Sequence, residues 1–230
     1  MKTSKHDQGL DNVVDFFSGK PLSSLNDYQP IRLSPELDGL EMLYSNESSG
    51  DKLFSLKILC WALCANGEVV GMVPWLDDII PCAEIRDPLN GKWEGYYDPG
   101  IDEIFFEAPI HKVVELETAA EYYEYICEQP DDIVQEIPDI IGTHAVLADT
   151  DFKSLILQEV ISWRLHGDGS ICGMIVDADK VESTPVLPGD KCLQSAQLDI
   201  RFKYFFQHHI ANKIKSEDPE ALAAISALVE

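Results

Sequence analysis

The sequence contains few basic residues and no long apolar run. Lys and Arg account for only 17 of the 230 residues, against 41 Asp and Glu, so the formal net charge is −24. A surface this acidic repels nucleic acid and anionic lipid headgroups and attracts basic partners or cations. No stretch approaches the ~20 apolar residues of a membrane span, and the N-terminal stretch MKTSKHDQGLDNVVDFF lacks the apolar segment of a secretory signal. We therefore expect a cytoplasmic protein that binds neither nucleic acid nor membrane.

The sequence also lacks the spaced motifs of common catalytic and metal sites. It contains no HExxH, no dinucleotide-binding fingerprint and no phosphate-binding loop. Cys60 and Cys64 form one close pair, but a structural zinc site usually combines two short C-x₂₋₄-C knuckles, and no second knuckle is present. We interpret the six cysteines as reduced core residues and predict no catalytic residue, no metal and no cofactor. Whether the protein is an enzyme stays open at this point.

One phrase occurs twice in the chain. WALCANGEVVGMV (61–73) and WRLHGDGSICGMI (163–175) align without gaps at an offset of 102, and two rare residue types match together with two glycines, at Trp61/Trp163, Met72/Met174, Gly67/Gly169 and Gly71/Gly173. Such a match predicts an internal duplication. Asn-Gly and Asp-Gly are typical of two-residue hairpin turns. We therefore predict two-residue hairpins over 57–75 and 159–177, with each Trp opposite the Met of its own copy.

The two copies differ on their second face. The first copy is apolar on both sides of its strand, which predicts a central, doubly buried strand. The second copy has Arg164 and His166 on one side, which predicts a half-exposed strand. Gly71 and Gly173 lie on this same face, where a missing side chain admits a neighbouring element or a ligand. Gly71, Arg164, His166 and Gly173 are therefore the candidate lining of a ligand cleft.

The order of the predicted elements indicates an α+β fold. Short apolar runs separated by turn residues predict mostly antiparallel sheets, and helices are expected at 117–129 and near the C-terminus. We divide the chain into a peripheral segment (1–35) and two related lobes from the duplication. The first lobe (36–140) contains the hairpin at 57–75 and the helix at 117–129. The second (141–230) contains the hairpin at 159–177 and a helical region from about 198 to the end.

Acidic residues are concentrated in the middle of the chain. Between Trp93 and Thr150 the only Lys or Arg is Lys112, and tyrosines are interleaved with the acids. Acidic side chains steer a basic partner, and tyrosines supply contact area at interfaces. The predicted partner-binding residues are Glu117, Glu121, Tyr122, Glu124, Tyr125 and Glu128. A solvated helix face would show the same acidic spacing without any partner.

Two functional hypotheses follow. The first is a non-enzymatic interaction or inhibitor-type protein that docks a basic protein. The alternative is an enzyme or small-molecule-binding protein with its site between the two lobes, since clefts between lobes are favoured sites. A deep pocket with convergent polar groups would favour the alternative, and a broad acidic surface would favour docking. The sequence does not determine the partner, the substrate or the oligomeric state.

Overall fold

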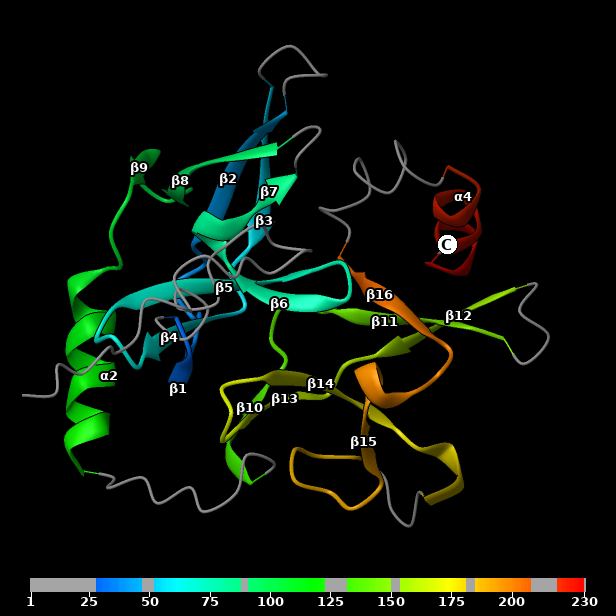
Figure 1. Ribbon diagram of the computed structural model, residues 1–230. Helices are drawn as coiled ribbons and strands as arrows, with labels where there is room; N and C mark the ends of the chain where they lie inside the picture. Colours follow the sequence, from blue (N-terminus) through cyan, green and yellow to red (C-terminus); the bar gives the residue numbers. More distant parts are fainter. Residues whose placement is uncertain are drawn as a thin grey trace, which may run out of the picture.

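The fold is mostly β. The computed structural model describes residues 28–46, 52–87, 91–122, 132–149, 154–180, 185–207 and 219–229. Strands account for 50% and helices for 16% of the structure, and the strands form four small antiparallel sheets in a propeller-like ring (Figure 1). The α+β prediction is therefore wrong.

Two sheets are built from the first half of the chain. The central sheet has the order β1-β4-β5-β6, from β1 (Pro30–Pro35), β4 (Cys60–Cys64), β5 (Val69–Trp75) and β6 (Asp78–Pro81). The second sheet has the order β3-β2-β8-β7, with β9 paired to β8; its strands are β2 (Glu41–Asn46), β3 (Lys52–Lys57), β7 (Arg86–Asp87), β8 (Gly91–Asp98) and β9 (Glu103–Phe105). A 3-10 turn, η2 (Cys82–Glu84), and the helix α2 (Ile110–Tyr122) complete this half.

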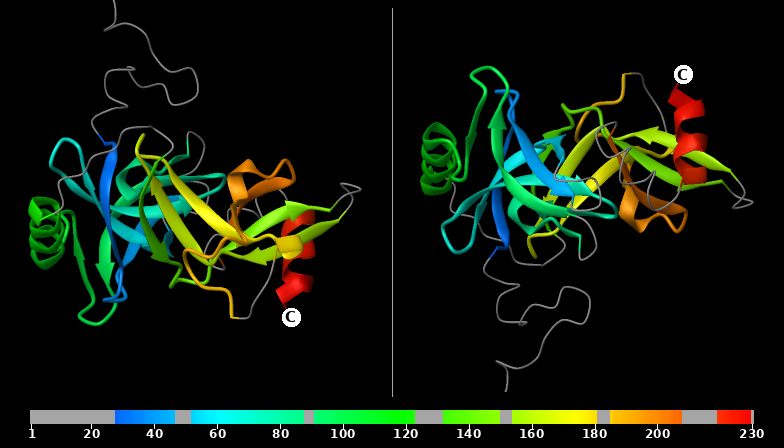
Figure 2. Two further views of the ribbon diagram at one scale, coloured as in Figure 1. Left: turned by 90° about the horizontal axis from the view of Figure 1, so that it is seen from below. Right: turned by 90° about the horizontal axis from the view of Figure 1, so that it is seen from above.

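The second half repeats this strand order. The distal sheet, β10-β13-β14-β15, consists of β10 (Ile133–Pro138), β13 (Ser162–His166), β14 (Ile171–Val176) and β15 (Leu193–Ser195). The fourth sheet, β12-β11-β16, consists of β11 (His144–Ala148), β12 (Leu155–Glu159) and β16 (Phe202–Phe206). Two 3-10 turns, η3 (Ala178–Lys180) and η4 (Ala196–Leu198), and the helix α4 (Pro219–Val229) belong to this half. Figure 2 shows α2 and α4 at opposite ends of the molecule.

Several elements begin or end at positions that differ from those expected from the sequence. Residues 30–35, expected in the peripheral segment, form β1, and residues 133–138, expected in the first lobe, pair with β13. The helix expected at 117–129 begins earlier, at Ile110, and residues 123–129 lie outside the described residues. The region from 198, expected to be helical, contains β16 before α4. The run FKYFF favours a strand because aromatic residues pack well on a pleated surface, and it pairs with β11.

Both repeated phrases form hairpins, but their turns contain three residues rather than two. In the first copy Gly67 has φ +85°, and the N–H of Cys64 donates to the carbonyl of Glu68 at 2.8 Å, closing a loop over 65–67. Such a loop combines a type I turn with a left-handed glycine. The register therefore pairs Trp61 with Gly71 and Cys60 with Met72, and the second copy shows the same shift. The prediction of Trp opposite Met is wrong, because a one-residue shift turns each side chain to the other face.

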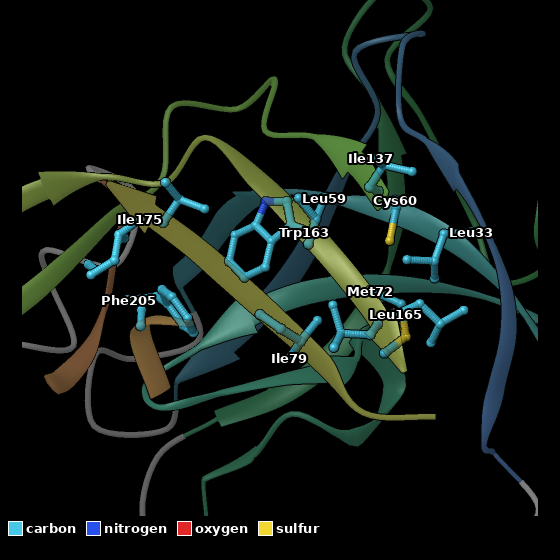
Figure 3. Close-up of a cluster of buried hydrophobic side chains, with 14 of the residues drawn as sticks. Leu33, Leu59, Cys60, Met72, Ile79, Ile137, Trp163, Leu165, Ile175 and Phe205 are labelled. Atoms are coloured by element: carbon cyan, nitrogen blue, oxygen red, sulfur yellow. The ribbon is translucent and has the colours of Figure 1, made fainter. Parts of the chain in front are cut away.

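The central sheet is buried on both faces, as predicted for the first copy. Every residue of β4 is buried, whereas Arg164 and His166 of β13 are only half-buried. One face carries Trp61 and packs against the second sheet. The other face carries Cys60 and Met72, which gather with Trp163, Leu165 and Phe205 in the cluster of Figure 3. The central sheet is thus enclosed between the second sheet and the distal sheet.

Equivalent tryptophans are fixed in the same way in both halves. The indole Nε1 of Trp61 donates to Glu36 at 2.5 Å, and that of Trp163 donates to Asp139 at 2.9 Å. Each tryptophan also packs on a ring from the neighbouring sheet, Tyr96 at 4.8 Å and Phe205 at 5.0 Å between ring centroids. The two copies therefore match in their tertiary contacts as well as in their sequence.

Candidate functional site

The predicted partner-binding residues are located only in part. Glu117 is exposed on α2, and the same helix ends with Glu121 and Tyr122. Glu124, Tyr125 and Glu128 lie outside the described residues. The docking role of this set therefore stays a prediction.

The glycines of the predicted cleft are packed beneath aromatic rings. A Cβ atom built on Gly71 would lie 2.8 Å from Cε1 of Tyr96, and one built on Gly173 would lie 2.7 Å from Cε1 of Phe205. The space left by each missing side chain is thus filled by a neighbouring strand.

Arg164 of the predicted cleft forms an ion pair within the distal sheet, and the backbone of His166 helps to close the hairpin turn. Arg164 Nε donates to Glu136 at 2.9 Å, and the backbone N–H of His166 donates to the carbonyl of Ser170. None of the four predicted residues, Gly71, Arg164, His166 and Gly173, lines either of the two cavities described next.

Glu136 is a half-buried carboxylate that joins several parts of the distal sheet. Burial acts to raise the pKa of Glu136, but hydrogen bonds from Ser162, Arg164 and the N–H of Gly189 outweigh it and lower that pKa. These bonds tie β10 and β13 to the 185–190 loop. Because Glu136 and Arg164 satisfy each other here, their arrangement is structural.

The larger cavity, called here the apolar groove, has a volume of about 690 Å³. It lies between α2, β5, η2 and β8, and its lining residues are Tyr28, Glu68, Val69, Val70, Pro81, Ala83, Glu84, Trp93, Tyr96, Phe106, Glu107, Ala108, Ile110 and Val113. Trp93 packs edge-on against Phe106, with centroids 5.8 Å apart. Phe106 is 66% exposed and Ile110 is 76% exposed. Exposed large apolar side chains that converge on a concavity are typical of a binding site.

The charges around the apolar groove are all negative. Its charged lining residues are Glu68, Glu84 and Glu107, and none of its described lining residues is Lys, Arg or His. Lys112, the only Lys or Arg between Trp93 and Thr150, is buried and lies within 4 Å of Asp38 and Glu115, so it does not offset these acids. The apolar surface is therefore combined with an acidic rim.

Two titratable groups beside the groove respond to this negative charge. The Glu68 carboxylate, followed by burial and by Glu84, raises the pKa of Tyr28. Burial raises the pKa of the Cys64 thiol to about 12, and Glu68 and Glu84 add to the shift. Glu68 and Glu84 thus raise the pKa of the same two groups, and both line the apolar groove.

The smaller cavity, called here the acidic pocket, has a volume of about 330 Å³. It lies between the two halves, where the β13–β14 turn approaches β5 and β6, and its charged lining residues are Asp78, Glu84 and Asp168. Tyr28, Pro81 and Glu84 line both cavities, so the acidic pocket and the apolar groove share a wall.

Gln29 fixes the position of this shared wall. Its backbone carbonyl accepts a hydrogen bond from Ala65 at 2.8 Å, and its side-chain Nε2 donates to the carbonyl of Gly167 at 3.2 Å. Its Cγ also lies directly over Gly169, where an added Cβ would be only 2.3 Å away. One residue therefore contacts both hairpin turns and holds the acidic pocket in place.

The carboxylates of the acidic pocket have different environments. Burial, opposed by a hydrogen bond from the Ile79 N–H and reinforced by Asp77, raises the pKa of Asp78. A side-chain hydrogen bond from Ser170 is the main cause that lowers the pKa of Asp168. The pKa of Asp78 is thus shifted in the opposite direction to that of Asp168, although Asp78 is an exposed residue of the pocket.

The structure gives no sign of a metal centre or a membrane span in the part that it describes. No three His, Cys, Asp or Glu side chains of the described ranges gather as ligands would. Cys60, Cys64, Cys82 and Cys192 are buried free thiols, as their interpretation as core residues predicted, whereas Cys172 is half-buried and the sixth cysteine lies outside the described residues. No helix in these ranges combines the length and apolarity needed to cross a bilayer.

Comparison with known proteins gives no match. No family model, no curated protein and no solved structure matches this chain. Function is therefore inferred from the chemistry of the two cavities.

Proposed function

We propose that this chain is a non-enzymatic cytoplasmic interaction protein that binds a basic protein partner through the apolar groove. The observation that carries the proposal is the combination of exposed apolar side chains with a rim that is only acidic. The five described cysteines are free thiols, which supports a reducing compartment.

The apolar part of the groove supplies affinity. Phe106 and Ile110 are exposed in the free protein, and covering them removes apolar surface from water. This contributes about 25 cal/mol per Å² of apolar area, part of which is offset by the lost freedom of the two proteins. Ile110, Val114 and Glu117 follow one another at helical spacing along the exposed side of α2. The groove therefore continues onto the helix that carries the predicted acidic residues.

The acidic rim supplies selectivity and speed of association. Glu68 and Glu107 are exposed, so they attract positive charge before contact is made. The same carboxylates repel acidic proteins, whose net charge is negative like that of this chain. The rim therefore favours a partner whose docking face is basic and partly apolar.

The lining of both cavities supports binding over the alternative of an enzyme between the lobes. A nucleophilic site needs a nucleophile within hydrogen-bond reach of a base such as His or Lys. Among the described residues that line the two cavities, none is His, Cys, Lys or Arg. The charged groups that line the two cavities are carboxylates, which suit the binding of a cation.

The test is affinity capture from the native cytoplasm with wild type and a groove variant, Glu68→Gln, Glu84→Gln and Glu107→Gln. We expect a basic protein that wild type retains and the groove variant loses. As a purified pair, this protein should bind the groove variant at least about tenfold more weakly, a difference of ~1.4 kcal/mol. Binding to wild type should also weaken as salt rises, because exposed charges are screened beyond ~8 Å at physiological ionic strength.

A control variant makes the same change in charge at a distance. Glu159→Gln, Asp179→Asn and Glu220→Gln alter three exposed acids in the second half of the chain. This control should bind the captured protein as wild type does. If it loses binding to the same extent as the groove variant, net charge alone is responsible and the apolar groove is not the docking site. A captured partner that is acidic would also refute the proposal.

A further inference from the structure

We propose that the partner presents one segment with two features, a bulky apolar side chain that fills the apolar groove and a Lys or Arg that enters the acidic pocket. This inference rests on the proposed docking function and names the chemistry of the docked segment. The observation behind it is the shared wall of Tyr28, Pro81 and Glu84, which makes the two cavities parts of one surface.

The two cavities select different side chains. In the apolar groove, Trp93, Phe106 and Ile110 offer ring faces and aliphatic surface to an apolar anchor. In the acidic pocket, Asp78, Glu84 and Asp168 bring three carboxylates from separate stretches of the chain around one cavity of about 330 Å³. A long basic side chain suits this arrangement, because its aliphatic stem can lie along Ile79 and Pro81 while its charged end reaches the acids.

Charge inside the acidic pocket favours a cation from the partner. Burial raises the pKa of the Cys172 thiol, which follows Ile171 of the pocket lining, and Asp168 and Asp78 add to that shift while Ser195 and Arg164 oppose it. No described residue that lines the acidic pocket carries a positive charge. A Lys or Arg of the partner would therefore lower the energy of Asp78, Glu84 and Asp168 together.

The apolar groove also contains a donor without an acceptor. Trp93 lines the groove, and its Nε1 is buried with no hydrogen-bond partner within the described part of the chain. A buried unpaired donor costs about 1–3 kcal/mol, so such groups are rare in a complete structure. Because this N–H is shielded from solvent, a docked segment would pair with it only if the lining of the groove opened.

The test begins with a random dodecapeptide library displayed on phage and selected on the full chain. We expect the enriched peptides to contain a bulky apolar residue together with Lys or Arg. The best peptide is then synthesised in three forms: unchanged, with its apolar anchor replaced by Ala, and with its basic residue replaced by an uncharged residue of similar length. Fluorescence anisotropy should show at least about tenfold weaker binding for each altered form.

Two protein variants then assign each peptide residue to its cavity. Asp168→Asn removes one charge from the acidic pocket and is safe for the fold, because Asn66 occupies the equivalent turn position of the first copy. It should weaken binding of the unchanged peptide but not of the uncharged form. Phe106→Ala should weaken binding of the unchanged peptide but not of the anchor-less form. Asp179→Asn, the same chemical change at an exposed site elsewhere, should alter neither.

The outcomes separate this inference from the docking function beneath it. If the enriched peptides are basic but Asp168→Asn weakens the charged and uncharged forms equally, the two-part segment is wrong and docking at the groove survives. If uncharged or acidic peptides are enriched as strongly as basic ones, both proposals are wrong. Circular dichroism and thermal unfolding of each variant confirm that a change in binding is not a change in fold.

Discussion

Replacing Gly173 by Ala would place a methyl group against two aromatic rings. The new Cβ would lie 2.7 Å from Cε1 and 2.9 Å from Cζ of Phe205, and 3.0 Å from Cζ3 of Trp163, whereas ordinary contacts begin at 3.4 Å. Phe205 and Trp163 are both fully buried, so neither ring can turn outward to make room. The contact with Phe205 must therefore be relieved by moving β14 away from β16.

The expected cost follows from this overlap. Overpacking of a well-packed core by one methyl group costs about 1–3 kcal/mol, and two immobile rings place Gly173→Ala in the upper half of that range. For a chain of this length, 1 kcal/mol corresponds to roughly 2–4 °C in Tm. We therefore expect Tm to fall by about 4–12 °C. Gly71→Ala should show a loss of similar size, because its Cβ would lie 2.8 Å from the ring of Tyr96.

Equilibrium unfolding in urea, followed by tryptophan fluorescence, measures this loss. Gly100→Ala is the matched control, because its nearest atom is Oδ1 of Asp98 at 3.1 Å, the end of a side chain in an exposed turn. The control should change the free energy of unfolding by no more than about 0.5 kcal/mol. Adding Phe205→Leu should recover part of the loss in Gly173→Ala. If Gly173→Ala is as stable as the control, the packing argument for both glycines is refuted.

Three further predictions concern the second half of the chain and the cysteines. Asp139→Ala removes the acceptor of the buried Trp163 indole and of the N–H of Thr143, so we expect a loss of about 2–5 kcal/mol in urea unfolding, and Asp139→Asn should recover part of it. The pKa of Glu136 is lowered in the folded protein, so this carboxylate stabilises the fold above the ordinary Glu pKa of 4.5, and the stabilisation is lost as pH falls through the lowered pKa. Urea unfolding at roughly pH 3–6 should therefore show a smaller loss of stability with falling pH for Glu136→Gln than for wild type. An identical pH profile for the two proteins would contradict the assignment. The purified protein should contain no stoichiometric zinc and keep its circular dichroism spectrum in chelator, because burial raises the pKa of the Cys60 thiol and disfavours the thiolate that zinc needs. A metal analysis that finds about one zinc per chain would overturn this prediction.

The repeated phrase located both hairpins, but it did not determine their register. Asn-Gly fits a two-residue turn, and it fits equally well the last two positions of a three-residue loop. The second form is adopted because the side chain of Asn66 accepts a hydrogen bond from the N–H of Glu68 at 2.9 Å, and Asp168 accepts one from Ser170 in the same way. These local bonds turned Trp61 toward Gly71 instead of Met72.

The burial of the first copy was predictable, whereas the groove was not. A strand that is apolar on both faces must be buried on both faces by neighbouring elements, and this predicted the enclosed position of β4. The groove instead combines residues from β5, η2, β8 and α2, which are brought together only by the packing of two sheets. Phe106 appears in the sequence as part of an apolar run, and nothing local distinguishes an exposed residue in such a run from a buried one. The α+β assignment failed because residues 30–35, expected in a peripheral segment, and residues 202–206, expected in a helical region, form paired strands.

The double burial of the central sheet has a consequence for synthesis on the ribosome. The chain emerges from its N-terminus, so the face with Cys60, Ala62 and Met72 is completed before the distal sheet that covers it exists. The covering residues follow roughly 100 positions later, which takes about 5–20 s at ~5–20 residues per second. During that interval the nascent first half exposes an apolar sheet face. A chaperone that binds nascent chains should therefore engage this protein until Trp163 has emerged.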